Sequence, residues 1–166
     1  IEKKAEDPVI NISYFKNPKI IITLFIAFIT GIIIMGMIFV PQFSENSLKI
    51  VSGSGGYFVI ILGVFAGVGA PFSGKLIDKY GAKIVLGTGF IASILGSVYI
   101  TFYAASDPSL FSVVLCLILL GIGIGFTMGT PINYMMLDNT RIEESNSALA
   151  TVSLIRSIGT AVAPAI

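Results

Sequence analysis

The sequence predicts an all-α integral membrane protein, built as a transmembrane helix bundle, from three observations. Of the 166 residues, 55% are hydrophobic and 11% are charged, with a mean hydropathy of +0.95, whereas soluble proteins average about 25% charged residues. Residues 50–73 and 84–106 contain no Asp, Glu, Lys or Arg, and each run exceeds the roughly 20 residues that a helix needs to cross a bilayer. Between them, residues 74–83 hold three lysines and one aspartate. We therefore expect 74–83 to form a tight turn at the cytoplasmic surface, where basic residues concentrate.

The same criteria predict about five spans. The spans cover residues 20–40, 50–73, 84–106, 109–137 and 145–166, and a charged cytoplasmic lead-in or linker occupies residues 1–19. Pro41 is expected to close the first span, because proline interrupts helices. The chain stops within an apolar run, so we expect it to be a piece of a longer protein; a small complete membrane protein is the alternative.

Small residues four positions apart predict where the helices pack together. In lipid, such residues allow two helix backbones to approach closely. They form three groups: Gly63 and Gly67 in the second span, Gly89, Ser93 and Ser97 in the third, and Gly121, Gly125 and Gly129 in the fourth.

Polar or flexible side chains within the spans are candidates for lining a substrate cavity. They are Thr23, Thr30 and Met37, which share one helix face, Thr127, Thr130, Asn133 and Tyr134 in the fourth span, and Arg156 in the last. Each has an alternative role: the threonines can bond to their own helix backbone, Asn133 can bond a neighbouring helix, and Arg156 can extend to the interface. We expect Pro131 and Asn133 to interrupt the fourth helix near its inner end.

The composition also restricts the chemistry. The chain has no histidine and one cysteine, Cys116, so it lacks the commonest metal ligand and cannot form an internal disulfide. No cluster of metal-ligand residues and no phosphate-binding lysine loop is present, and we expect no enzyme activity, no metal and no cofactor. The net charge of +1 gives no reason to expect a nucleic-acid partner. The expected partner is the lipid bilayer.

Residues 74–83 resemble the G-x-L-x-D-x-x-G loop signature of the major facilitator superfamily of transporters. Six residues match the signature and its basic positions: Gly74, Leu76, Asp78, Lys79, Gly81 and Lys83. The resemblance implies a partial major facilitator fold in the cell (plasma) membrane, with this stretch as a gating loop. It also implies a small-molecule substrate and transport by alternating access.

Other stretches resemble the fourteen-span drug:proton antiporter branch of that superfamily. Residues 7–10 and 14–17 resemble the entry to its second half, and residues 121–133 and 147–159 resemble the tenth and eleventh spans of its drug exporters. The resemblance implies the carboxyl-terminal half of a transporter. The amino-terminal half fits less well, because Leu117 stands where that half usually carries an arginine.

The resemblance further implies proton-coupled efflux of drugs or small amphipathic solutes. The first four spans contain no acidic residue, so the proton-carrying carboxylates would belong to the missing half. Asp78 would bond a helix N-terminus across the interface between halves in one transport state; the alternative is a solvated charge balanced by neighbouring lysines. A solute importer of the same fold and a non-transporting membrane scaffold remain the rival functions.

Overall fold

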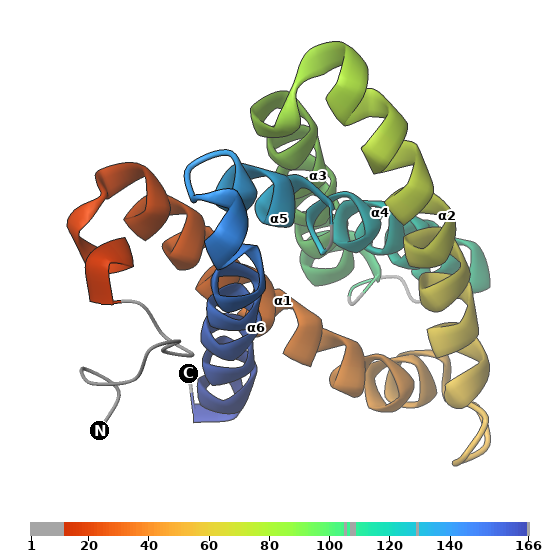
Figure 1. The fold of residues 1–166 in the computed structure, drawn as a ribbon. Coiled ribbons are helices and arrows are strands. Elements are labelled where there is room, and N and C mark those ends of the chain that lie inside the picture. Colours follow the sequence, from red (N-terminus) through yellow and green to blue (C-terminus); the bar gives the residue numbers. More distant parts are fainter. Residues whose placement is uncertain (1–11, 105, 107–108, 129, 166) are drawn as a thin grey trace. The chain divides into compact units, whose positions relative to one another are not determined.

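The computed structural model describes residues 12–104, 106, 109–128 and 130–165, and within them every regular element is a helix (Figure 1). The chain forms two compact units, one comprising the residues up to Met35 and from Ile132 onward, the other Gly36–Pro131. Three features expected from the sequence lie outside the described residues: most of the lead-in, the packing residue Gly129 and the end of the last span.

The helices follow one another with short connections. In chain order they are a 3₁₀ turn at Ile12–Lys16, α1 at Pro18–Leu48, α2 at Gly56–Tyr80, α3 at Ala82–Tyr99 with a π-helical turn at Ile100–Ala104, α4 at Leu110–Thr127, α5 at Thr130–Leu137, a 3₁₀ turn at Ile142–Glu144, α6 at Ser145–Val162 and a 3₁₀ turn at Ala163–Ala165.

Within the described residues, five stretches are long and apolar enough to cross a membrane, which confirms the expected fold class. They are Pro18–Leu48, Gly56–Tyr80, Ala82–Phe102, Leu110–Leu137 and Ile142–Ala165. Large apolar side chains lie on their outer surfaces, among them Phe25, Ile60 and Ile91, which are 62%, 60% and 59% exposed. Such a surface is unfavourable in water and suits lipid or further helices.

α1 continues through Pro41 to Leu48, so the expectation that Pro41 closes the first span is wrong. Proline already has a helical φ and removes only one backbone hydrogen bond, which a long helix tolerates. The added turns carry Glu45, whose Oε1 accepts hydrogen bonds from the backbone N–H of Gly53 at 2.8 Å and Gly55 at 2.9 Å. The extension of α1 therefore holds the segment that leads into α2.

The turn between α2 and α3 consists of Gly81 alone, so the expected tight turn is present but its expected extent over residues 74–83 is wrong. Gly81 has φ 83° and ψ 154°, a backbone region that is essentially restricted to glycine. Its N–H donates to the Ile77 carbonyl at 2.8 Å, closing α2. One glycine reverses the chain, and the remaining charged residues lie on helices.

The expected fourth span is divided into α4 and α5. α4 ends at Thr127 and α5 begins at Thr130. Pro131 lies in the first turn of α5, where a backbone N–H has no partner within the helix and its absence costs little. The predicted interruption is therefore present, but it precedes Pro131 and Asn133.

In the second unit, α4 packs against both α2 and α3 (Figure 1). A Cβ added to Gly121 or Gly125 would lie 2.7 or 2.5 Å from a backbone oxygen of α2. A Cβ added to Gly123 would lie 2.7 Å from the backbone nitrogen of Ser93 in α3. Glycine is required at these contacts because the helix backbones touch. The packing expected at Gly121 and Gly125 is confirmed.

The packing expected at Gly63 and Gly67 is wrong for the described residues. Both glycines are exposed, and no atom lies within 4 Å of a Cβ added to either. In α3, Gly89 and Ser93 are buried as expected, but Ser97 is exposed. The spacing of small residues identifies a helix face, whereas the neighbouring helices decide whether that face is covered.

In the first unit, α1 crosses α6 at two glycines. Gly31 lies against the carbonyl oxygen of Arg156, and Gly159 lies against the carbonyl oxygen of Phe28. The Thr160 hydroxyl donates to the Gly31 carbonyl at 3.2 Å. This reciprocal contact leaves no room for a side chain on either glycine.

Candidate functional site

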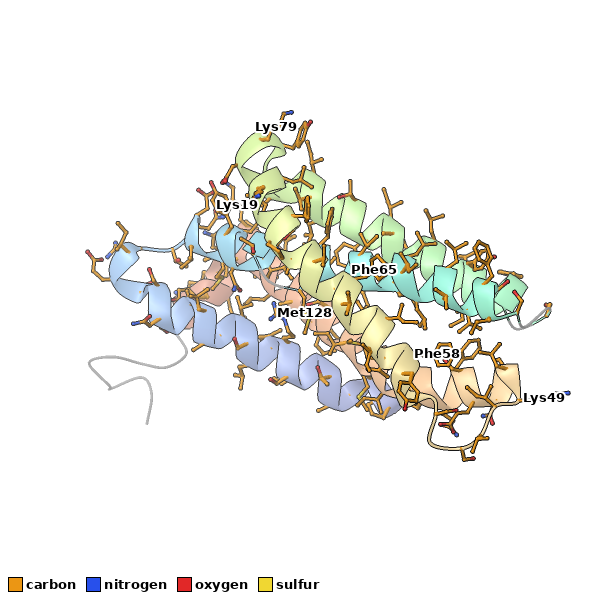
Figure 2. The ribbon with its side chains drawn as sticks, turned by 90° about the vertical axis from the view of Figure 1, so that its right-hand side faces the viewer. Lys19, Lys49, Phe58, Phe65, Lys79 and Met128 are labelled. Atoms are coloured by element: carbon orange, nitrogen blue, oxygen red, sulfur yellow. The ribbon has the colours of Figure 1, made fainter. Side chains whose placement is uncertain are left out.

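The residues that match the loop signature occupy the end of α2 and the start of α3. Gly74 and Leu76 are partly buried, whereas Asp78, Lys79, Gly81 and Lys83 are exposed. On the opposite face of the same turns, Ser73 and Ile77 are buried. Figure 2 shows Lys79 at this end of α2, where its Nζ lies 5.1 Å from the centroid of the Tyr80 ring. The signature therefore forms a charged helix end with one buried side.

Asp78 lies at an electrostatically unfavourable position. It belongs to the last turn of α2, where the backbone carbonyls give the helix a partial negative charge. A carboxylate there opposes its own helix by about 0.3–1 kcal/mol. Lys75, three residues earlier, and Lys79 partly offset this. The exposed carboxylate would gain more from a positive helix N-terminus than from its own helix.

The buried threonines of the predicted cavity bond to their own helices. Thr23 and Thr30 donate to the carbonyls of Lys19 at 2.9 Å and Ala27 at 2.7 Å. Thr127 donates to the Gly123 carbonyl at 3.0 Å. These bonds satisfy the hydroxyls inside apolar surroundings. A cavity-lining role for the threonines stays a prediction, as it does for the partly buried Met37.

The three candidates on α5 have different environments. Thr130 and Tyr134 are exposed and Asn133 is partly buried. The Thr130 hydroxyl lies 4.0 Å from where a Cβ on Gly74 would stand, so the start of α5 adjoins the signature helix. The structure thus brings Thr130 to the signature residues, a proximity that the sequence did not predict.

Arg156 lies well inside a membrane-spanning stretch. At 1.5 Å per residue it is about 16 Å along α6 from Ser145. Its Nε and Nη2 atoms are buried and have no hydrogen-bond partner among the described residues. The structure therefore places a cationic donor inside the span without an acceptor.

A pocket that the sequence did not predict lies beside the start of α1. It has a volume of about 360 Å³ and is lined by Tyr14, Asn17 and Ile20 on one side and by residues 139–141 and Glu144 on the other. The Tyr14 ring is buried, and its hydroxyl donates to the Glu144 carbonyl at 3.5 Å. Burial raises the pKa of Tyr14. An aromatic residue in a lead-in segment does not by itself indicate this burial.

Comparisons with known proteins agree with the architecture. The family model described as Major Facilitator Superfamily matches residues 2–164. The uncharacterized MFS-type transporter YfiU of Bacillus subtilis (strain 168) is 30% identical over 99% of this chain and 31% of its own length.

Two further relatives have names that mention a compound. The lincomycin resistance protein LmrB of Listeria innocua is 32% identical over 74% of this chain and 26% of its own length. The riboflavin transporter RibZ of Clostridioides difficile is 28% identical over 96% of this chain and 36% of its own length. The chain thus spans about a third of the length of the curated relatives that it matches. No solved structure matches.

Proposed function

Because this chain belongs to the Major Facilitator Superfamily, we propose that it is part of a secondary transporter that exports drugs or small amphipathic solutes in exchange for protons. The observation that carries the export proposal is the similarity to the lincomycin resistance protein, 32% identical over 124 residues. Under this proposal the chain is the carboxyl-terminal part of a longer transporter in the plasma membrane, and α2 ends on the cytoplasmic side.

Proton exchange requires a buried titratable group whose charge changes during transport. Within the described membrane-length stretches, Asp and Glu occur only in the outermost turns, at Glu45, Asp78, Glu143 and Glu144. Under the proposal, a carboxylate in the remaining two thirds of the transporter carries the proton. This chain then supplies cavity wall and a gating element.

The signature helix is proposed to act as the gate. Alternating access requires contacts that form in one state and break in the other. Asp78 suits such a contact because it is exposed, lies at the negative end of α2, and would be stabilised by a helix N-terminus in another part of the transporter. Its flanking lysines keep the helix end at the membrane surface.

The proposal is tested with the full-length transporter in lipid vesicles that contain a pH-sensitive dye. With lincomycin as the probe, we expect accumulation to depend on an imposed pH gradient and to dissipate it. Lincomycin transport without proton movement would exclude proton exchange. Absence of both fluxes would favour a membrane scaffold.

Transport of a vitamin-like solute by a solute importer is the second candidate, and its substrate class is favoured by the similarity to the riboflavin transporter, which is 28% identical over 165 residues. The same vesicles separate the two candidates when riboflavin replaces lincomycin. Riboflavin flux without lincomycin flux would overturn the drug-export proposal and support a vitamin-like substrate.

A further inference from the structure

We propose that Arg156 forms a specific binding site for a carboxylate, through the edge of its guanidinium that carries Nε and Nη2. These two nitrogens are the atoms that are buried and without a hydrogen-bond partner among the described residues. They lie on the same edge of the planar group, and their N–H bonds are parallel. This edge matches the two oxygens of a carboxylate, which guanidinium groups bind in a bidentate manner.

The depth of Arg156 argues against a charge that merely extends to water. It lies about 16 Å along α6 from Ser145, roughly half of a hydrocarbon core about 30 Å thick. An arginine that reaches the interface exposes its guanidinium head. In Arg156, by contrast, two nitrogens of the guanidinium head are buried.

Among the described residues of its own unit, the acidic residues nearest to Arg156 along the chain are too far away to pair with it. Asp138, Glu143 and Glu144 all precede Ser145, the first residue of α6. A helix is rigid, so a separation of about 16 Å along it cannot be closed by side chains. A buried charge that lacks a partner is strongly unfavourable. The complementary carboxylate is therefore expected from a bound ligand or from another part of the transporter.

The backbone at Arg156 is held in place by α1. Its carbonyl oxygen packs on Gly31, and the Thr160 hydroxyl donates to both the Arg156 carbonyl at 3.1 Å and the Gly31 carbonyl at 3.2 Å. The backbone that carries the guanidinium is thus held where two helices are in direct contact. Such support on rigid elements orients a binding group before the ligand arrives.

The test compares three arginine variants of the intact transporter purified in detergent. R156K keeps the positive charge but loses the bidentate edge, and R156Q loses both. R141K is the matched control, because Arg141 is exposed in the turn before α6. The probes are 1-naphthylacetate, which carries a carboxylate, and 1-naphthylacetamide, which has the same ring and a neutral amide. Equilibrium binding of each probe and thermal stability are measured.

If the carboxylate belongs to a substrate, the unmodified transporter and R141K should bind the acid more tightly than the amide. R156K and R156Q should reduce this preference about 10-fold or more, as expected for the loss of charge-assisted hydrogen bonds. A carboxylate from the transporter itself predicts no preference. In that case R156Q and R156K lose thermal stability, and replacing one membrane carboxylate elsewhere by its amide restores it in R156Q.

The proposal is overturned if R156K matches the unmodified transporter in both acid preference and thermal stability, because charge alone would then suffice. The site rests on the proposed function only if the carboxylate belongs to a transported substrate. Probe binding and thermal stability are measured without transport. Absence of lincomycin transport would therefore overturn drug export without affecting the test of the Arg156 site.

Discussion

Asp78 is exposed and lies at the negative end of its own helix, and these two properties determine the effect that we predict for its replacement. A carboxylate in the last turn of α2 gains nothing from its own helix dipole. An interaction with the positive N-terminus of another helix would make the electrostatic energy of the Asp78 carboxylate favourable. The residue is therefore expected to act on the balance between transport states and to have little effect on the folding of this chain.

Replacing Asp78 with Asn is expected to lower turnover about tenfold while substrate affinity stays within about twofold. In a partly buried contact between the carboxylate and a helix N-terminus, the charge–dipole energy can reach about 1.4 kcal/mol, and losing it in one state shifts the two-state balance by that factor. Lincomycin flux and equilibrium binding are measured in the same preparation. Glu143→Gln is the control, since Glu143 is also an exposed acid. Unchanged turnover in Asp78→Asn would remove the gating role.

Gly81 and Gly74 are equivalent in the sequence signature and different in the structure. Gly81→Ala is expected to destabilise the protein by about 1–3 kcal/mol, because φ 83° and ψ 154° strain any residue with a Cβ. Gly74→Ala is expected to be neutral or slightly stabilising, since Gly74 is helical and its nearest neighbour for a Cβ is 4.0 Å away. Thermal denaturation in detergent measures both. Equal destabilisation by the two variants would contradict the single-residue turn.

At the scale of elements, the α1–α6 crossing depends on backbone contact. Gly31→Ala would place a methyl group against the Arg156 carbonyl, and we expect a loss of about 1–3 kcal/mol, as for overpacked interiors. Gly36→Ala is a matched control on the same helix, because no atom lies within 4 Å of its added Cβ. Thermal denaturation is measured for both variants. Equal denaturation midpoints for Gly31→Ala and Gly36→Ala would show that the α1–α6 backbone contact is not needed for stability.

Some properties of the elements were predictable from the sequence and others were not. Long apolar runs located all five spans, because partition into lipid depends mainly on length and apolar content. The ends were less predictable: α1 passes Pro41 and α2 includes most of residues 74–83. A helix continues wherever its backbone bonds can close, and neither a proline nor a charge prevents this by itself.

At the scale of the whole molecule, the orientation in the membrane is set by charge at the helix ends. Lys49 precedes α2 and Lys79 lies in its last turn, and Figure 2 shows them at opposite ends of the second unit. The basic bias of cytoplasmic loops predicts that Lys79 faces the cytoplasm and Lys49 the outside.

Single-cysteine variants test this orientation in a background in which Cys116, which is buried, is replaced by Ser. We expect a membrane-impermeant thiol reagent to label Lys49→Cys in intact cells and Lys79→Cys only after permeabilisation. Labelling is read from a mass shift on a gel. The reverse pattern would invert the topology and place the signature helix end outside.

The sequence by itself determined that the chain is an α-helical membrane protein with five spans and a charged signature between the second and third. These properties follow from length, apolar content and local spacing, all of which lie within one stretch of chain. Only the tertiary structure decided that, among the described residues, Gly125 is covered while Gly63 is bare, and that two buried nitrogens of Arg156 have no hydrogen-bond partner there. Such facts depend on which helix faces meet, and the residues that meet are far apart in the sequence.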